Sequence, residues 1–198
     1  ADQKFDNLDQ LKKAIQQDYK SVQSFFERQN EPNQYKHHSA VVILNYNGLK
    51  YFKIFLDEII RVLGPSHHLV IADNASTDAS VEYVRNNYPQ IELIHISKNL
   101  GFAGGYNEAL KKVSAQYYVL LNSDILIKSD WASPIISSME KNASIGAAQP
   151  KIRAYDNRNR LEYAGAAGGW IDVLGYPFCR GRILESTEED EGRYNDDQ

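Results

Sequence analysis

The stretch AVVILNYNG, residues 40–48, decides the fold class. Its first five residues form an uninterrupted apolar run, which is typical of a strand buried on both faces of a parallel sheet. The asparagines and the glycine that follow permit unusual backbone angles and a close approach to a ligand. The sequence therefore predicts a buried strand that ends in a polar loop at one edge of a sheet.

Outward from this strand, predicted helices and strands alternate along the chain. Helices are expected over residues 51–63, 78–87, 105–114 and 131–141, and further strands over residues 68–72, 91–96, 117–121 and 145–149. Repeated strand–helix–strand units predict an α/β fold with a doubly wound, mostly parallel sheet flanked by helices. After Gly168 the pattern gives way to glycine, tyrosine and proline and then to an acidic tail, with no further element expected.

Residues 1–38, before the first predicted strand, have a different sequence pattern. Apolar residues recur there at steps of three and four, which predicts an amphipathic helix followed by a polar linker over residues 30–38. The linker contains His37 and His38, which we expect to be solvated. The chain thus divides into residues 1–38 and a domain over residues 39–198. The apolar stripe consists of Leu8, Leu11, Ile15, Tyr19, Val22 and Phe26.

Composition excludes several classes of protein. The 198 residues suffice for one sizeable core, and a net charge of −4 argues against nucleic-acid binding. The single cysteine, Cys179, cannot form an internal disulfide, which fits a reducing compartment. No apolar stretch is long enough to span a bilayer. A cytoplasmic location is expected, with work at the inner face of the membrane left open.

The loop DNASTD, residues 73–78, follows the second predicted strand. Ligands bind outside the carboxyl ends of the strands in such sheets. The Asp73 carboxylate could accept a hydrogen bond from a ring N–H or a ribose hydroxyl. Helix capping is the competing interpretation, and Ser76, Thr77 and Asp78 suit it well. Capping leaves Asp73 unexplained, which favours a ligand role for it.

Three glycines lie between the third strand and the next helix, in NLGFAGGYN, residues 99–107. They resemble a phosphate cradle, in which backbone N–H groups at a helix start meet an anion. Their spacing and their place after the third strand do not fit the dinucleotide fingerprint. A nicotinamide-dependent dehydrogenase is therefore disfavoured.

The fourth loop, NSD at residues 122–124, follows the strand expected over residues 117–121. One carboxylate at this edge, Asp124, suits Mg²⁺ or Mn²⁺, since Mg²⁺ binds through one or two carboxylates together with substrate phosphates. A surface turn with Asp124 as a cap is the alternative. The motif alone does not separate the two.

Taken together, the segments VVILNYNG, VIADNASTDAS, NLGFAGGYNEAL and VLLNSDI resemble the family 2 glycosyltransferases with a GT-A fold, in particular the bacterial rhamnosyltransferase-like group. The segments occur in the order of that family. The resemblance implies that Asp124 is the metal ligand and that Asn122 stands where the family has the first aspartate of an Asp-x-Asp motif. It further implies that nucleotide-sugar contacts come from Asn45, Tyr46, Asn47, Asp73, Ser76, Asp78, Asn99, Gly101, Asn107 and Asn122.

The resemblance also implies an inverting displacement on a nucleoside-diphosphate sugar, with transfer to a saccharide or lipid-linked acceptor in surface polysaccharide synthesis. A carboxylate would act as the general base. Asp172 is a weak candidate for it, and the acidic run at residues 188–191 is expected to be a solvated face. We expect the base beyond Gln198, in a chain truncated before its acceptor-binding part.

Two alternative functions remain beside the glycosyltransferase interpretation, and the oligomeric state is open. A non-catalytic nucleotide-sugar-binding module would use the same pocket without chemistry. A nucleotidyltransferase is disfavoured, because residues 45–50 hold only one glycine and one lysine. A homo-oligomer is left open.

Overall fold

The computed structural model describes residues 35–163 and 166–194, together with four residue pairs near the N-terminus, 9–10, 12–13, 16–17 and 19–20. The four pairs are helical and exposed. Most of the apolar stripe predicted there lies outside the described residues, and Tyr19, the member that is described, is 68% exposed. The amphipathic helix therefore stays a prediction. Within the described residues no helix is both long and apolar enough to cross a membrane.

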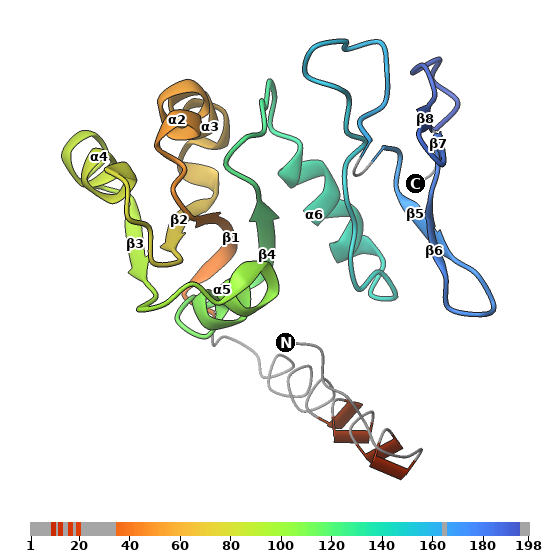
Figure 1. Ribbon diagram of the computed structural model, residues 1–198, viewed down its shortest axis with the longest axis horizontal. Coiled ribbons are helices and arrows are strands. Elements are labelled where there is room, and N and C mark those ends of the chain that lie inside the picture. Colours follow the sequence, from red (N-terminus) through yellow and green to blue (C-terminus); the bar gives the residue numbers. More distant parts are fainter. Residues whose placement is uncertain are drawn as a thin grey trace.

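A four-stranded parallel sheet lies between the helices on one side of the molecule, and the C-terminal hairpins lie on the other (Figure 1). Its order is β3-β2-β1-β4, so the first strand along the chain lies inside the sheet. The strands are β1 (His37–Asn45), β2 (His68–Asp73), β3 (Glu92–His95) and β4 (Ala115–Leu121). Residues 40–43 of β1 are fully buried, as expected of a strand covered on both faces. The predicted α/β fold is confirmed.

Helices cover both faces of the sheet. Alternate residues of β1 point to opposite sides, so the strand contributes to one core on each face. Val41 and Ile43 pack in a core with the helical stretch that follows β1, whereas Ala40 and Val42 pack in a second core with α5 (Gly101–Leu110). The stretch after β1 runs through α2 (Leu49–Tyr51), the π-helical η1 (Phe52–Leu56), α3 (Asp57–Leu63) and the short η2 (Gly64–Ser66). On the same side lies α4 (Ser80–Asn87).

Two expected elements differ in the structure. Helix α5 begins four residues earlier than predicted, so its glycines lie inside the helix. The strand expected over residues 145–149 is absent, and that segment, which follows α6 (Ala132–Lys141), has no regular structure. It is largely exposed and alanine-rich, and alanine is depleted in strands because it offers little side chain to pack.

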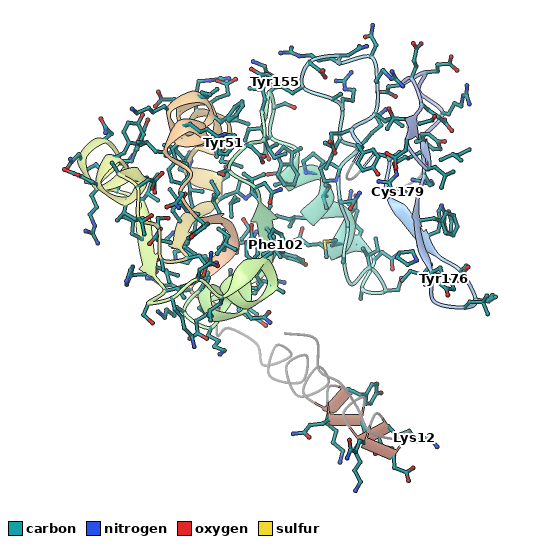
Figure 2. All side chains as sticks on the ribbon, in the orientation of Figure 1. Lys12, Tyr51, Phe102, Tyr155, Tyr176 and Cys179 are labelled. Atoms are coloured by element: carbon teal, nitrogen blue, oxygen red, sulfur yellow. The ribbon has the colours of Figure 1, made fainter. Side chains whose placement is uncertain are left out.

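The C-terminal region holds elements that the sequence did not predict. Antiparallel pairs form between β5 (Gly169–Ile171) and β6 (Pro177–Cys179) and between β7 (Arg182–Ile183) and β8 (Ser186–Thr187). A small core of Leu161, Ala166 and Ala167 lies beneath them. Figure 2 shows Tyr176, in the turn between β5 and β6, at the side of the molecule away from β1 and β2.

Two expectations about charged and polar side chains hold only in part. The acidic run is not simply a solvated face, because the side chain of Asp190 is only 9% exposed and lies 2.7 Å from the Lys151 amine. His37 and His38 belong to β1 and not to a linker; His38 is exposed, as expected, whereas His37 is half-buried. The ring of His37 stacks on that of His68, with 3.7 Å between centroids.

Candidate functional site

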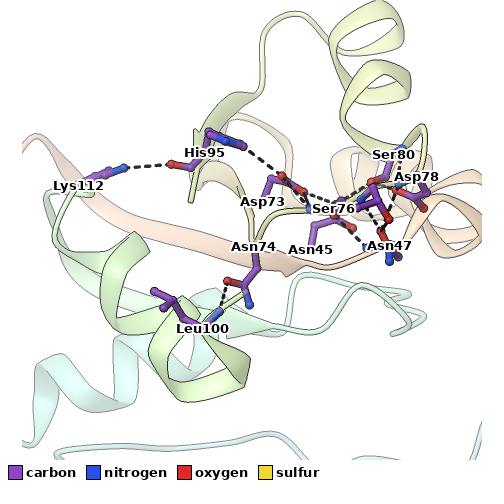
Figure 3. Close-up of polar contacts among 11 residues, drawn as sticks. Asn45, Asn47, Asp73, Asn74, Ser76, Asp78, Ser80, His95, Leu100 and Lys112 are labelled. Carbon is purple, nitrogen blue, oxygen red and sulfur yellow. Dashed lines mark hydrogen bonds and ion pairs between the residues drawn. The ribbon is translucent and has the colours of Figure 1, made fainter. Parts of the chain in front are cut away.

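The carboxyl ends of three neighbouring strands bring the predicted polar loops together. Asn45 is the last residue of β1 and pairs in register with Asp73, the last residue of β2. Asp73 in turn pairs with His95, the last residue of β3. Figure 3 shows these side chains lying next to one another. The edge chosen from the sequence is therefore one continuous polar surface.

The carboxamide of Asn45 is 1% exposed and organises this surface. Its Nδ2 lies 3.0 Å from Asp73 Oδ1, 2.9 Å from Ser76 Oγ and 2.8 Å from Ser80 Oγ. Its Oδ1 accepts a hydrogen bond of 3.1 Å from the backbone N–H of Gly48. Because the amide has only two N–H groups, three acceptors share them. Asn45 thus fixes the orientation of the neighbouring carboxylate.

Asp73 is 2% exposed, yet its two oxygens are used unequally. Oδ1 accepts from Asn45 at 3.0 Å and lies 3.4 Å from the Ser76 backbone nitrogen. Oδ2 has longer contacts, 3.3 Å to the same nitrogen and 3.5 Å to His95 Nδ1. A carboxylate oxygen accepts about two hydrogen bonds. Oδ2 therefore keeps capacity for a further donor.

Asn47 joins the first loop to the second. Its backbone φ is 54°, a left-handed conformation that asparagine tolerates better than most residues. Its Oδ1 accepts from the backbone N–H groups of Thr77 at 2.7 Å and Asp78 at 3.2 Å, and its own N–H donates to Ser76 Oγ at 2.9 Å. The expectation that Ser76 or Thr77 caps α4 is wrong, because the N-cap is Ala79 and no side chain caps it.

Asp78 holds the starts of two helices. Oδ2 accepts from the backbone N–H of Leu49 at 3.0 Å, and Oδ1 accepts from the backbone N–H and the hydroxyl of Ser80. Partial burial opposes ionisation of this carboxyl, but the hydrogen bonds from Ser80 and Leu49 outweigh it and lower the pKa of Asp78. Its role in the structure is to fasten α2 to α4.

Asn74 is a site residue that the sequence reasoning missed. It is 2% exposed; its Oδ1 accepts from the Leu100 backbone N–H at 3.0 Å, and its Nδ2 donates to Asn99 Oδ1 at 3.0 Å and to the Gly101 carbonyl at 3.1 Å. These bonds join the second loop to the start of α5. The available signal in the sequence was an amide directly after the strand-end carboxylate Asp73.

The glycines of the third loop lie at the start of α5 and inside it, and Gly105 has a packing role there. Gly105 lies inside α5, where an added Cβ would stand 2.8 Å from Leu44 Cδ1 and 3.0 Å from Asn74 Nδ2. Gly101 begins the helix with a φ of 70°. Gly105 therefore lets α5 approach β1 closely, which brings the helix start to the edge of the site.

The remaining predicted ligand residues are exposed. The fourth loop lies beside the first, since a Cβ on Gly48 would stand 3.7 Å from Ser123 Oγ. In the part of the chain that the structure describes, no cluster of three or more histidine, cysteine or acidic side chains could hold a metal alone. Asp124 is thus a single carboxylate. The exposed residues are Tyr46, Asn99, Asn107, Asn122 and Asp124.

Asp172 has a different role from the one considered for it. Its Oδ1 accepts from the backbone N–H groups of Leu174 at 2.8 Å and Tyr176 at 2.9 Å, which closes the turn between β5 and β6. In Figure 1 this hairpin is separated from β1 and β2 by β4 and α6. These contacts indicate a turn-forming residue.

Comparison with known proteins identifies the family. The model described as glycosyl transferase family 2 matches residues 40–188, which is most of the chain. The chain belongs to this family. The match covers the sheet, the polar edge and the C-terminal hairpins, so the resemblance to the family 2 glycosyltransferases is confirmed.

Relatives of this family 2 domain are about a quarter identical to it over the aligned residues. It is 26% identical over 111 residues to an uncharacterized glycosyltransferase of Haemophilus influenzae, covering 54% of this chain and 34% of the relative. It is 26% identical over 132 residues to the poly-beta-1,6-N-acetyl-D-glucosamine synthase of Staphylococcus epidermidis, covering 62% of this chain and 32% of that one. The domain therefore spans about a third of the length of these curated relatives.

Solved structures show weaker similarity to the family 2 domain. TarS of S. aureus in complex with UDP-GlcNAc superposes with a TM-score of 0.46 at 20% identity, covering 59% of this chain and 38% of that one. The mannosyltransferase PcManGT of Pyrobaculum calidifontis, in complex with GDP-Man and Mn²⁺, gives a TM-score of 0.45 at 20% identity, covering 69% of this chain and 44% of that one.

Proposed function

We propose that this chain is the donor-binding part of an inverting glycosyltransferase and binds a nucleoside-diphosphate sugar at the carboxyl edge of its sheet. Family membership supports the reaction class, and the polar edge supports the place of binding. The acceptor is a saccharide or a lipid-linked saccharide in surface polysaccharide synthesis. The name of the S. epidermidis relative, a polysaccharide synthase, supports this choice.

The geometry of Asp73 carries the proposal. Asn45 donates to Oδ1, and the Ser76 backbone N–H lies between the two oxygens, 3.4 Å from Oδ1 and 3.3 Å from Oδ2, so Oδ2 keeps capacity for a further donor at the strand end. A ring N–H of a nucleobase is the donor that such an oxygen suits, and hydrogen bonds to charged groups are stronger than average. Tyr46, exposed beside it, would contact the base or ribose.

The diphosphate would lie toward β4. When bound, Mg²⁺ or Mn²⁺ supplies positive charge that stabilises the departing nucleoside diphosphate. Exposed Asp124 fits such an ion, since Mg²⁺ takes one or two carboxylates and fills its other positions with water and phosphate oxygens. The neutral amide of Asn122 adds a hydrogen bond without charge, and Asn107 would lie close to the sugar-phosphate.

An observation on the hairpin favours a second candidate, a binding module without chemistry. Inversion needs a carboxylate that takes the proton of the acceptor hydroxyl. Asp172 is engaged by two backbone N–H groups of its own turn. If no other carboxylate of the whole protein reaches the acceptor, the same pocket holds the nucleotide-sugar without transferring it.

Calorimetry tests the proposal. The chain is titrated with UDP, dTDP and GDP, each with Mn²⁺ and with EDTA, and at least one nucleotide should bind, more tightly with Mn²⁺. Absence of binding to all three in both conditions would contradict the proposal. A transfer assay on the full-length protein then separates the enzyme from the binding module.

A further inference from the structure

His95 lies at the end of β3 and belongs to none of the motifs that predicted the site. It pairs in register with Asp73, and its Nδ1 lies 3.5 Å from Asp73 Oδ2 (Figure 3). The two side chains differ sharply in exposure, 68% for His95 and 3% for Asp73. The exposed ring therefore lies beside Asp73 Oδ2, the oxygen that keeps acceptor capacity.

The backbone around His95 is held in place while its ring is exposed. Lys112 Nζ donates to the His95 carbonyl at 3.2 Å, and the next residue, Ile96, donates its N–H to the Asp73 carbonyl at 2.9 Å. These bonds fasten the end of β3 to the turn that follows α5 and to β2. The histidine is thus presented at the site from a fixed position and is not on a free loop.

His95 and Asp73 together define a pattern of one hydrogen-bond donor next to one acceptor. A carboxylate next to Nδ1 favours ring forms that carry a proton on that nitrogen. Oδ2 then offers an acceptor, and Nδ1–H offers a donor beside it. A flat base edge that presents an N–H next to a carbonyl oxygen matches both groups at once.

Resting on the proposed function, we propose that His95 is a specificity-determining residue that donates to the base carbonyl next to the ring N–H bound by Asp73. Uracil, thymine and guanine present this N–H and carbonyl side by side. Cytosine and adenine present a bare ring nitrogen next to an amino group, so both groups of the pair would face the wrong partner. The site therefore takes a uracil, thymine or guanine nucleotide and rejects cytosine and adenine nucleotides.

If His95 and Asp73 formed only a surface ion pair, His95 would not affect which base binds. An exposed ion pair contributes little to stability and would leave the choice of base unchanged. A donor that touches the base changes the ratio of affinities between two bases, because the wrong base leaves the donor without an acceptor. The ratio of affinities is therefore the quantity to measure.

The test measures dissociation constants of the wild-type chain for UDP, dTDP, GDP, CDP and ADP by calorimetry with Mn²⁺. At least one of the first three should bind about tenfold or more tightly than CDP and ADP. His95→Leu should weaken the preferred nucleotide about three- to tenfold, the loss of one hydrogen bond, and leave CDP unchanged. His95→Gln, which keeps a donor, should restore most of the affinity.

His38→Leu is the matched control. His38 is an exposed histidine near the opposite end of β1, and its Nε2 lies 2.8 Å from Glu140 Oε1. This variant should leave every dissociation constant unchanged, and thermal unfolding should show that all three variants fold.

The possible results separate the two proposals. Equal losses for all nucleotides in His95→Leu, or no loss at all, would overturn the role of His95 while nucleotide binding by the wild-type chain stands. Tight binding of CDP or ADP would overturn it as well. If the wild-type chain binds none of the five nucleotides, the proposed function itself fails.

Discussion

At the scale of single residues, Asp73→Ala should weaken binding of the preferred nucleotide by about 1.5–3 kcal/mol, the range for a hydrogen bond to a charged group. The physical reason is the loss of Oδ2, the carboxylate oxygen that keeps capacity for a further donor. Calorimetry measures the change, with Asp156→Ala as the control, since Asp156 is an exposed aspartate of the C-terminal region. Equal affinities in wild type and Asp73→Ala would show that the base binds elsewhere.

Asp78 yields a prediction about pH at the same scale. Its pKa in the fold lies below the ordinary value of 3.8, because Ser80 and Leu49 donate hydrogen bonds to the ionised carboxylate. Its contribution to stability is therefore complete above pH 3.8 and is lost as the pH falls through the lowered pKa of the folded state. Asp78→Asn should be less stable than wild type in urea at neutral pH.

The difference in stability between wild type and Asp78→Asn should shrink at acidic pH, below the pKa of Asp78 in the fold, because the wild-type carboxyl is then neutral as well. Asp156→Asn serves as the control and should match wild type at both pH values, because Asp156 is exposed. A stability difference for Asp78→Asn that is the same at neutral and acidic pH would contradict the assigned cause of the shift.

Single residues also show how far the sequence could lead. Asp73 was identifiable because a carboxylate at the end of a buried strand has few structural explanations. The hydroxyls of Ser76 and Thr77 were misread as caps, because local pattern cannot reveal Asn47, some 30 positions away in sequence, as their partner. His95 carried no motif; only the register between β2 and β3 places it beside Asp73.

At the scale of elements, the contact between α5 and β1 depends on Gly105. Gly105→Ala adds a methyl group 2.8 Å from Leu44 Cδ1. Overpacking of this kind costs about 1–3 kcal/mol, whereas alanine gains about 1 kcal/mol in helix propensity. We expect a net loss of stability, measured by thermal or urea unfolding.

Gly146→Ala is the control for this substitution. An added Cβ at Gly146 meets nothing within 4 Å, and this glycine lies in the irregular segment after α6. Its unfolding midpoint should stay close to that of wild type. If Gly105→Ala unfolds at the same midpoint as this control, the close approach of α5 to β1 does not limit stability.

The same helix explains an error in the predicted boundaries. Glycine has low helix propensity, so the run of glycines moved the predicted start of the helix to residue 105. In the structure Asn74 binds the Leu100 N–H and the Gly101 carbonyl, and this tertiary contact fixes the earlier start. The short strands β5 to β8 were missed because segments of two or three residues carry no measurable alternation.

At the scale of the whole molecule, the proposed site extends along the sheet edge, from Asp73 at the end of β2, past β1, to Asp124 beyond β4. The two carboxylates would hold opposite ends of one ligand, the base and the metal-bound diphosphate. Neither depends on the other for its position, since Asp73 is fixed by Asn45 and Ser76. Changes at the two sites should therefore act on different parts of the ligand.

Asp124→Ala should remove most of the gain in UDP, dTDP or GDP affinity that Mn²⁺ gives and leave affinity in EDTA unchanged, whereas Asp73→Ala should weaken binding in both conditions. Because the residues touch separate groups of the ligand, the double variant should lose affinity additively within about 0.5 kcal/mol. Calorimetry of wild type, the two single variants and the double variant, each with and without Mn²⁺, gives all the binding free energies that the comparison needs. If Asp124→Ala weakens binding equally in Mn²⁺ and in EDTA, the carboxylate acts without the metal, and the diphosphate lies elsewhere along this edge.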